Sequence, residues 1–334
     1  MDVGRFPIPS PFPINAPAFR SALLSWYRKN GRDFPWRRTR DPYAILVSEI
    51  MLQQTQVATV LPYYKEWLRR FPDFKALARA LESDVLHAWQ GLGYYARARN
   101  LHAATKAIVS RQSGTFPADV TAMRALPGLG RYTANAVATF AFDQSVPVVE
   151  ANIARLLVRL IDLQLPIDSA AGTTAVWTLA GDLVPKRHAG RFNSALMDLG
   201  ALVCSARQPK CGQCPVRKFC AAIDPASLPR KRAKPSTKFL AENHAFALRR
   251  GRILLEQSQK RWRGMWILPR LTRASRPAPV YRAEFPFTHH RITLTVFAAP
   301  AAATPHRRWF LPSQIETLPV PSPHRRALRA LLDS

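Results

Sequence analysis

The sequence predicts a multidomain fold, in which an all-α domain is followed by a smaller α+β domain. The 334 residues are long enough for two domains with a sizeable core. Between Ala18 and Ala222 the apolar residues recur at helical spacing, with short Gly and Pro breaks and no alternating pattern. After residue 240 the apolar period changes to two, which is typical of β-strands.

Residues 1–17 contain prolines at positions 7, 9, 11, 13 and 17. A segment so rich in proline does not match the apolar core of a signal peptide, so we interpret it as a disordered or extended arm. No apolar run approaches the ~18 residues needed to span a bilayer. We therefore expect a cytoplasmic protein that has no membrane partner.

The charge is strongly basic, with 49 Lys and Arg against 21 Asp and Glu and a formal net charge of +28. A field of this sign attracts polyanions, and nucleic acid is the first candidate. An anionic membrane is the competing partner, but the basic residues do not gather on one amphipathic helix. The charge alone also leaves open a basic surface that is merely solvated.

The second domain is predicted to follow a linker, residues 223–240, which holds three prolines and five basic residues. NHAFALRRGRILLEQ then predicts a hairpin that turns at Arg250–Gly251, and RITLTVFAA predicts a strand. The last periodic segment, SPHRRALRALL, predicts a helix. Residues 241–334 are therefore expected to form the α+β domain.

All four cysteines lie within residues 204–220, in the pattern C-x6-C-x2-C-x5-C. They are Cys204, Cys211, Cys214 and Cys220. A secreted disulfide framework spreads its cysteines more widely, whereas four thiolates on one loop can close around an iron–sulfur cluster or zinc. Zinc sites usually present two separated C-x2-C arms, and only one pair here has that spacing, which favours the cluster.

Two further stretches indicate helix starts that could serve a site. LPGLGRYTANAVATF places Gly128 and Gly130 before a helix that is expected to begin near Tyr132, so backbone N–H groups could face a phosphate. VPVVEANIAR places Glu150 before another helix, with Asn152 just inside it. Alone, the first pattern also fits an ordinary helix–helix turn, and the second also fits a helix cap.

The cysteine spacing, the hairpin and the helical region together resemble the endonuclease III/MutY superfamily of DNA glycosylases. The resemblance implies a helix–hairpin–helix glycosylase domain over residues 18–222, with a [4Fe–4S] cluster on the loop 204–220. Members that also cut the strand carry a Lys after GLGR, whose amine forms a Schiff base. This chain has Tyr132 there, which points to the monofunctional MutY branch.

Two segments resemble the base pocket and the catalytic helix of that branch. GRDFPWR is similar to its adenine-pocket segment, which implies that Arg32 contacts the base edge and Trp36 walls the pocket. Phe34 stands where Leu is usual. SEIMLQQTQV is similar to its catalytic helix, which implies that Glu49 is the catalytic acid.

The same helix and a later loop supply two residues for the DNA. The resemblance implies that Gln54 lies near the pair being separated. GLGYYARARNL is similar to the loop whose first tyrosine, here Tyr94, wedges beside the lesion. Ordinary helix packing is the alternative for each segment, but four such segments occur in the family's order.

The resemblance continues into the second domain. WRGMWILPR resembles a stretch of the branch's Nudix-like domain, and FTHHRITLTVF resembles its F-[ST]-H loop. That loop reads 8-oxoguanine in the family, which implies that Thr288 and His289 contact the lesion. No Nudix box of Glu residues is present, so residues 241–334 are expected to recognise a lesion and not to hydrolyse a nucleotide.

The implied reaction removes adenine mispaired with 8-oxoguanine or guanine from double-stranded DNA after rotating it out of the stack. The expected protein is a bacterial, nucleoid-associated monomer. Two carboxylates in different environments supply the chemistry. Glu49 lies among apolar neighbours that would raise its pKa, so it could protonate the adenine ring. The family's second carboxylate is an Asp two residues before an Asn, and here that position is Glu150, with Asn152 in place.

Glu150 adds a methylene, about 1.5 Å, to that side chain, and misplacement of this order costs about a hundredfold in rate. A pocket reshaped with the help of Phe34 would keep the activity. Altered base specificity, weak activity or non-catalytic lesion binding are the alternatives. We expect an active adenine glycosylase, because a pure binder has no need for Glu49, Tyr132 and Asn152 together. A glycosylase/lyase would need a lysine near Tyr132.

Overall fold

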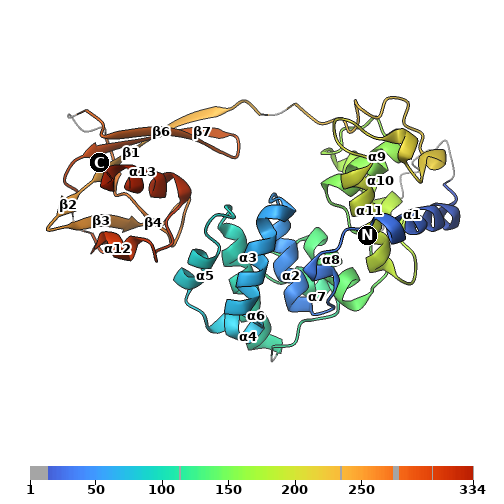
Figure 1. Ribbon diagram of the computed structural model, residues 1–334, viewed down its shortest axis with the longest axis horizontal. Helices are drawn as coiled ribbons and strands as arrows, with labels where there is room; N and C mark the ends of the chain where they lie inside the picture. Colours follow the sequence, from blue (N-terminus) through green and yellow to red (C-terminus); the bar gives the residue numbers. More distant parts are fainter. Residues whose placement is uncertain (1–13, 113, 234, 274–277, 303, 334) are drawn as a thin grey trace. The chain divides into compact units, whose positions relative to one another are not determined.

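The computed structural model describes residues 14–112, 114–233, 235–273, 278–302 and 304–333. The chain forms two compact units, one from residues 1–53 and 111–233 and the other from residues 54–110 and 234–334. In the described part of residues 18–222 the regular structure is helical, and the strands begin at Lys238 (Figure 1). The predicted order of an all-α region and a smaller α+β region is confirmed.

The first unit is helical. Its elements are α1 (Ala16–Asn30), η1 (Pro35–Arg37), α2 (Pro42–Leu52), α7 (Val120–Arg124), α8 (Arg131–Phe142), α9 (Ala151–Leu160), α10 (Ala170–Leu183), α11 (Ala189–Leu202), η2 (Cys211–Gln213) and η3 (Arg217–Phe219). Acidic or hydroxyl side chains begin several of them, since Asp41, Asp119 and Ser169 each accept a hydrogen bond from a backbone N–H of the first turn. These caps explain why the helices start where they do.

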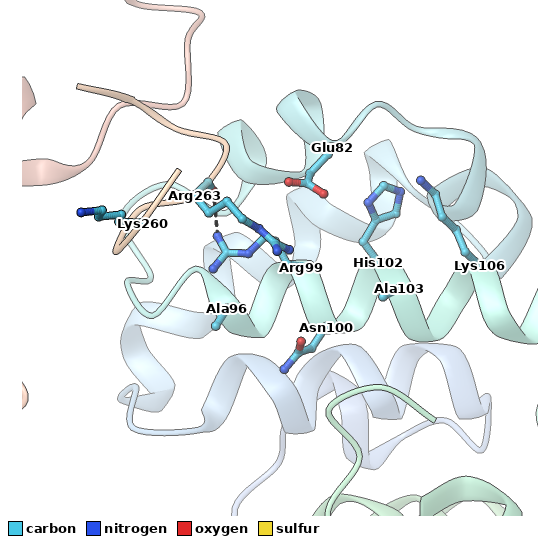
Figure 2. Close-up of a pocket in the computed structure, with 9 residues that line it drawn as sticks. All are labelled: Glu82, Ala96, Arg99, Asn100, His102, Ala103, Lys106, Lys260 and Arg263. Atoms are coloured by element: carbon cyan, nitrogen blue, oxygen red, sulfur yellow. Dashed lines mark hydrogen bonds between the residues drawn. The ribbon is translucent and has the colours of Figure 1, made fainter. Parts of the chain in front are cut away.

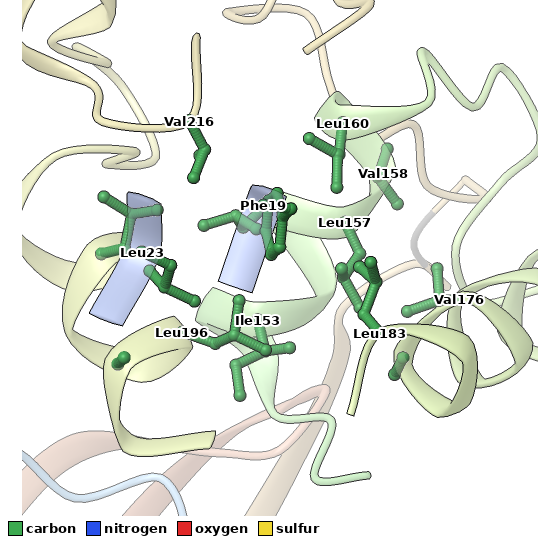
Figure 3. Packing of buried hydrophobic residues seen from close by; sticks show 14 of the residues in the cluster. Phe19, Leu23, Ile153, Leu157, Val158, Leu160, Val176, Leu183, Leu196 and Val216 are labelled. Atoms are coloured by element: carbon green, nitrogen blue, oxygen red, sulfur yellow. The ribbon is translucent and has the colours of Figure 1, made fainter. Parts of the chain in front are cut away.

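One core of this unit fixes the position of α9. Along α9, apolar side chains at positions i, i+3, i+4 and i+7 are buried, namely Ile153, Leu156, Leu157 and Leu160. They pack in a cluster with Phe19 of α1, Leu183 of α10, Leu196 of α11 and Val216 of the cysteine loop (Figure 3). Each buried aliphatic side chain contributes about 1.5–3 kcal/mol. The first turn of α9 is therefore held firmly against its neighbours.

The second unit combines helices with the strands. Its helices from the earlier part of the chain are α3 (Val57–Arg70), α4 (Phe74–Arg79), α5 (Glu82–Ala88) and α6 (Ala96–Gln112). The later part contains β1 (Lys238–Phe246), β2 (Leu248–Arg249), β3 (Arg252–Gln257), β4 (Trp266–Ile267), β5 (Arg270–Leu271), β6 (Tyr281–Phe287), β7 (His290–Ala298), β8 (Arg307–Phe310), α12 (Pro312–Ile315) and α13 (Ser322–Leu332).

The strands form two sheets. One has the order β5-β1-β7-β6, in which β1 and β7 run parallel and the other neighbours run antiparallel. In the other, β3 pairs with β2, β4 and β8. Arg249 of β2 lies opposite Arg252 of β3, so the predicted hairpin turn at Arg250–Gly251 is confirmed. The predicted strand and the last predicted helix are β7 and α13.

Two element boundaries differ from the predicted segment boundaries. Helix α1 begins at Ala16, inside the predicted arm, because Asn15 caps it and Pro17 occupies its first turn. Strand β1 begins at Lys238, inside the predicted linker, because it pairs with β7 along its whole length. The rest of the arm, residues 1–13, lies outside the described residues. Among the described residues, no helix combines the length and the apolar character needed to cross a membrane.

Candidate active site

Glu49 lies inside the first unit, near the end of α2. Asp41 caps this helix, and all side chains from Tyr43 to Met51 are buried, Glu49 among them. A helix that is apolar on every side belongs to the core, so an acid within it is costly unless it is protonated or paired. We therefore expect the carboxyl group of Glu49 to have a shifted pKa.

The Tyr132 hydroxyl donates a hydrogen bond to Oε2 of Glu49 at 2.6 Å. Burial raises the pKa of Glu49 to about 7, although the Tyr132 hydrogen bond opposes the rise. The charge of Glu150 raises this pKa further, and the charge of Arg37 lowers it. A carboxyl with this pKa can act as a proton donor at neutral pH.

Tyr132 is held by a helix–hairpin–helix made of α7, a short turn and α8. Gly128 has a φ of 75°, a left-handed conformation that glycine adopts readily, and Gly130 precedes the first residue of α8. Both glycines are exposed, whereas Leu126 and Leu129 are buried beneath them. The backbone N–H groups at the start of α8 have no partner within the helix, so the hairpin can face an anion.

Glu150 caps α9, so the helix-cap interpretation is confirmed. Its Oε2 accepts from the backbone N–H of Asn152 at 2.8 Å and its Oε1 from that of Ile153 at 2.8 Å. Burial nevertheless raises the pKa of Glu150, while these two backbone hydrogen bonds oppose the rise. Because Glu150 also shifts the pKa of Glu49, the cap and the acid belong to one electrostatic site. The two interpretations of Glu150 are therefore compatible.

A chain of hydrogen bonds runs from Glu150 to the cysteine loop. The Asn152 amide donates to Glu150 at 3.1 Å and accepts at Oδ1 from Nη2 of Arg155 at 2.9 Å. Nε of Arg155 donates to the carbonyl oxygen of Cys204 at 2.9 Å. One turn further on, Nη1 of Arg159 donates to Sγ of Cys204 at 3.3 Å. Residues on one face of α9 thus connect the cap with the loop.

Gly200 of α11 allows this close approach of α9. A Cβ at position 200 would lie 2.8 Å from both the Cβ and the carbonyl oxygen of Asn152. We expect Gly200→Ala to lower the free energy of unfolding by about 1–3 kcal/mol, because the two helices must separate. In the control Gly181→Ala, where a Cβ meets nothing within 4 Å, we expect no loss and a gain of up to about 1 kcal/mol. Urea unfolding measures both, and equal stability of the two variants would contradict the close packing.

The segment that resembles an adenine pocket is built around a buried acid. Asp198 of α11 is completely buried and accepts from Nε of Arg32 at 2.8 Å and from Nη1 of Arg37 at 2.7 Å. Phe34 lies 5.2 Å from Trp36 in a stacked arrangement, with the two guanidinium groups 5.0 Å from its ring centre. The two arginines and the two aromatic rings therefore form one rigid group.

Asp198 and Arg37 were not predicted from the sequence. The signal for Asp198 was available, because it is an acid within the apolar helix sequence SALMDLGAL, as Glu49 is within α2. Its pKa is lowered because the hydrogen bonds from Arg37 and Arg32 outweigh burial. Asp198 thus stays ionised in the interior, in contrast to Glu49, whose pKa is raised.

The four cysteines lie on one loop that packs against α9. Burial raises the pKa of Cys214 to about 11, and the charges of the other three thiols add to the rise, which indicates that they lie near one another. In the described part of the chain, no three His, Cys, Asp or Glu side chains are placed to hold a single metal ion. Four cysteines on one loop, of which Cys204 accepts a hydrogen bond from Arg159, are a donor set suited to an iron–sulfur cluster. When bound, the cluster would cross-link the loop through all four sulfurs.

Gln54 and Tyr94 belong to the second unit. Both are exposed, and their φ angles of 55° and 47° are uncommon for non-glycine residues and store strain. Nη2 of the buried Arg97 donates to Oγ1 of Thr55 at 3.1 Å and to the carbonyl oxygen of Leu92 at 2.7 Å. Its guanidinium also lies 5.6 Å from the centre of the Tyr94 ring. Arg97, which the sequence analysis did not select, therefore links the two strained turns.

Thr288 and His289 form the exposed turn between β6 and β7. Phe287 and His290 pair across this turn, and Thr288 has a φ of 53°. The Thr288 hydroxyl donates to the carbonyl oxygen of Phe287 at 2.7 Å. A β-branched residue at positive φ is a genuine outlier, so this turn holds its two polar side chains in a defined but strained geometry.

The chain is similar to known DNA repair proteins. Residues 47–164 match the HhH-GPD superfamily of base excision DNA repair proteins, and residues 204–220 match the iron–sulfur binding domain of endonuclease III. The adenine DNA glycosylase of Homo sapiens is 44% identical over 214 residues, which cover 61% of this chain and 39% of that protein. That of Mycolicibacterium smegmatis is 46% identical over 195 residues, which cover 58% and 66%. The chain thus spans less than two thirds of the length of these relatives.

Solved structures show the same architecture. A thermostable thymine-DNA glycosylase is 32% identical, with a TM-score of 0.56, and the match covers 62% of this chain and 95% of that one. Endonuclease III in a non-covalent DNA complex shares the fold at 21% identity, with a TM-score of 0.53 and coverage of 60% and 92%. Fold and site therefore define a helix–hairpin–helix base excision repair protein with a [4Fe–4S] loop. Within that class, the chain belongs to the MutY-type branch of the endonuclease III superfamily.

Proposed function

We propose that this protein is a monofunctional DNA glycosylase that removes adenine opposite 8-oxoguanine or guanine in double-stranded DNA. The observation that supports this most is the group formed by Glu49, Tyr132 and Glu150. It joins an acid with a pKa of about 7 to a second carboxyl group at a helix start. Relatives named adenine DNA glycosylase support adenine as the base.

The chemistry divides between the two carboxyl groups. Protonated Glu49 donates its proton to a ring nitrogen of the flipped-out adenine, so the base leaves as a neutral molecule. The sugar then carries positive charge, which ionised Glu150 stabilises. Water adds to the sugar, and the proton that it loses restores the acid form of Glu49. Asn152 orients Glu150 through the hydrogen bond between their side chains.

The other site residues would bind the DNA. Arg32 and Trp36 contact the extrahelical base, and Asp198 fixes the Arg32 side chain in place. Gln54 and Tyr94 lie against the base pair that is separated. Gly128 and Gly130 let the hairpin approach a backbone phosphate. The glycosylase domain, residues 18–222, would act as a monomer in the bacterial cytoplasm, on the nucleoid.

The β6–β7 turn would supply lesion recognition, as part of a Nudix-like domain, residues 241–334, that follows a basic linker. We expect Thr288→Ala and His289→Ala each to reduce the preference for 8-oxoguanine over guanine by about 3- to 10-fold, because each removes one hydrogen-bonding group. The measurement compares single-turnover rates on the two mispairs. Arg282→Gln, at an exposed position on β6, is the control. If both turn variants kept the full preference for 8-oxoguanine over guanine, residues outside this turn would have to recognise the lesion.

The proposed reaction uses water and no amine of the protein. Tyr132 occupies the position of the lyase lysine, and its hydroxyl is engaged with Glu49. We therefore expect borohydride to trap little covalent protein–DNA complex during adenine release. The variant Tyr132→Lys, which introduces an amine at this position, is the positive control for trapping. Efficient trapping of the natural protein would mean that another lysine attacks the sugar, and would support the lyase alternative.

A single-turnover assay tests the function directly. Adenine is placed opposite 8-oxoguanine, guanine or cytosine in otherwise identical duplexes, and thymine opposite guanine serves as the fourth substrate. We expect release of adenine opposite 8-oxoguanine and guanine and little release elsewhere. Release of thymine alone would indicate altered base specificity, as in the thymine-DNA glycosylase of the same fold. Tight binding without release of any base would indicate a lesion-binding protein.

A further inference from the structure

A pocket of about 460 Å³ lies in the second unit, between α6 and the turn that joins β3 to β4 (Figure 2). None of the proposed catalytic residues lines it. The residues that matter for its chemistry are Glu82, Arg99, His102, Lys106, Lys260 and Arg263. The pocket therefore needs an explanation separate from base release.

The pocket is cationic. Four basic side chains line it, from Arg99 and Lys106 on α6 and from Lys260 and Arg263 on the turn, against one acid, Glu82. In the described part of the chain none of the four forms an ion pair, in contrast to Arg32 or Arg307. Four positive charges gathered around a single acid repel one another, so the arrangement attracts an anion.

The two sides of the pocket are held together by backbone contacts. Nη1 of Arg99 donates to the carbonyl oxygen of Arg263 at 3.0 Å, the dashed line in Figure 2. Beside it, a Cβ at Gly264 would lie 2.9 Å from a carboxylate oxygen of Glu82, so glycine permits the close approach of the turn. The φ of Gly264 is 83°, which other residues rarely adopt. The pocket is thus built by the fold and not by chance proximity of long side chains.

A buried histidine in the wall supplies an independent observation. His102 is 2% exposed, and its Nε2 has no hydrogen-bond partner among the described residues. Its ring stands between Glu82 and Lys106 (Figure 2). A buried polar atom that has no partner within the protein usually binds a water molecule or an ion. In a cationic pocket the fitting occupant is an anion.

We propose that this pocket binds a phosphate group, at a site separate from the one that holds the extrahelical base. Guanidinium and ammonium groups both donate charge-assisted hydrogen bonds to the oxygens of a phosphate. The phosphate belongs either to the backbone of a DNA duplex or to a free phosphate compound. Ala96, the first residue of α6, also lines the pocket and follows Tyr94 by two residues, which favours the DNA backbone. The inference rests on the proposed function only in taking DNA as one source of the phosphate.

The test compares two double variants of the full-length protein that remove equal charge. Lys106→Gln/Arg263→Gln changes the pocket, and Lys75→Gln/Arg249→Gln changes two exposed positions of the same unit outside it. Affinity for a fully paired duplex is measured against salt concentration. Each lost phosphate contact reduces the slope of log affinity against log salt by about 0.9. We expect the pocket variant to lose about one to two units of slope and the control variant to lose almost none.

A second arm uses inorganic phosphate as the probe. The ring signals of His102 are followed by NMR while sodium phosphate replaces sodium chloride at constant ionic strength. A change in slope supports a DNA phosphate, whereas an unchanged slope with shifted His102 signals supports a free phosphate compound. An unchanged slope and unshifted signals overturn the proposal. Adenine release at saturating DNA is measured in parallel, so failure of the proposed function is distinguished from failure of the pocket.

Discussion

Replacing Glu49 by glutamine is expected to abolish adenine release while binding to the mispaired duplex stays nearly intact. A general acid contributes about 10²–10⁴-fold to a rate, and the loss should reach at least the upper end, because protonation of the base is the step that lets it leave. Glutamine keeps an acceptor for the Tyr132 hydroxyl, which donates to Glu49 at 2.6 Å. The variant therefore loses the titratable proton and keeps the local structure.

The stability of this variant separates chemistry from folding. The pKa of Glu49 is raised to about 7 in the folded protein. Ionising this acid therefore lowers the stability of the folded protein. The loss grows as the pH rises from the ordinary pKa of a glutamate, 4.5, towards the raised pKa of about 7. A neutral glutamine avoids this cost, so the melting temperature at pH 8 should not fall. Appreciable adenine release by Glu49→Gln would mean that the acid is misassigned.

Replacing Glu150 by serine should lower the single-turnover rate by several orders of magnitude without destabilising α9. Serine is a favoured N-cap residue, so it can accept from the first turn of the helix as Glu150 now accepts from Asn152 and Ile153. It carries no charge, however, and cannot stabilise a developing cation. Serine thus keeps the cap and removes the proposed catalytic function.

Glu150→Asp is the matched control, because it keeps both the cap and the charge. We expect it to retain activity, slowed by up to about a hundredfold, since the shorter side chain reaches less far. An aspartate variant faster than the natural protein would show that the pocket is not adapted to glutamate. If the serine variant were as fast as the natural protein, Glu150 would be a helix cap and nothing more.

Much of the fold followed from local patterns. The hairpin at Arg250–Gly251 and the strand β7 were predictable because turn residues and period-two alternation are local features. Helix α9 was predictable from its cap and apolar spacing. The pairing of β1 with β7 was not, because it joins segments about fifty residues apart and extends β1 into a stretch rich in proline and charge.

The site was predictable where residues lie on one helix and not where distant helices meet. Glu150 stood out as an acid in an apolar stretch, whereas the role of Glu49 was predicted from the resemblance of its segment to the family's catalytic helix. Asp198 is also an acid in an apolar stretch, but its pairing with Arg32 joins residues far apart in sequence and could not be predicted from local spacing. The same holds for the pairing of Arg97 with Thr55. The hydrogen bond between Tyr132 and Glu49, which tunes the acid, likewise depends on the packing of α2 against α8.

The pH dependence of the single-turnover rate on the adenine:8-oxoguanine duplex tests most directly whether Glu49 is the proton donor. Because Glu49 must be protonated and its pKa is about 7, the rate should fall about tenfold per pH unit above that pH. At lower pH the rate should fall again when Glu150, which must be ionised and whose pKa is raised by burial, takes up a proton. In Tyr132→Phe the falling limb should move to higher pH, since the hydrogen bond from Tyr132 lowers the pKa of Glu49. A rate that rises with pH through 7, or a limb that Tyr132→Phe leaves in place, would contradict the account.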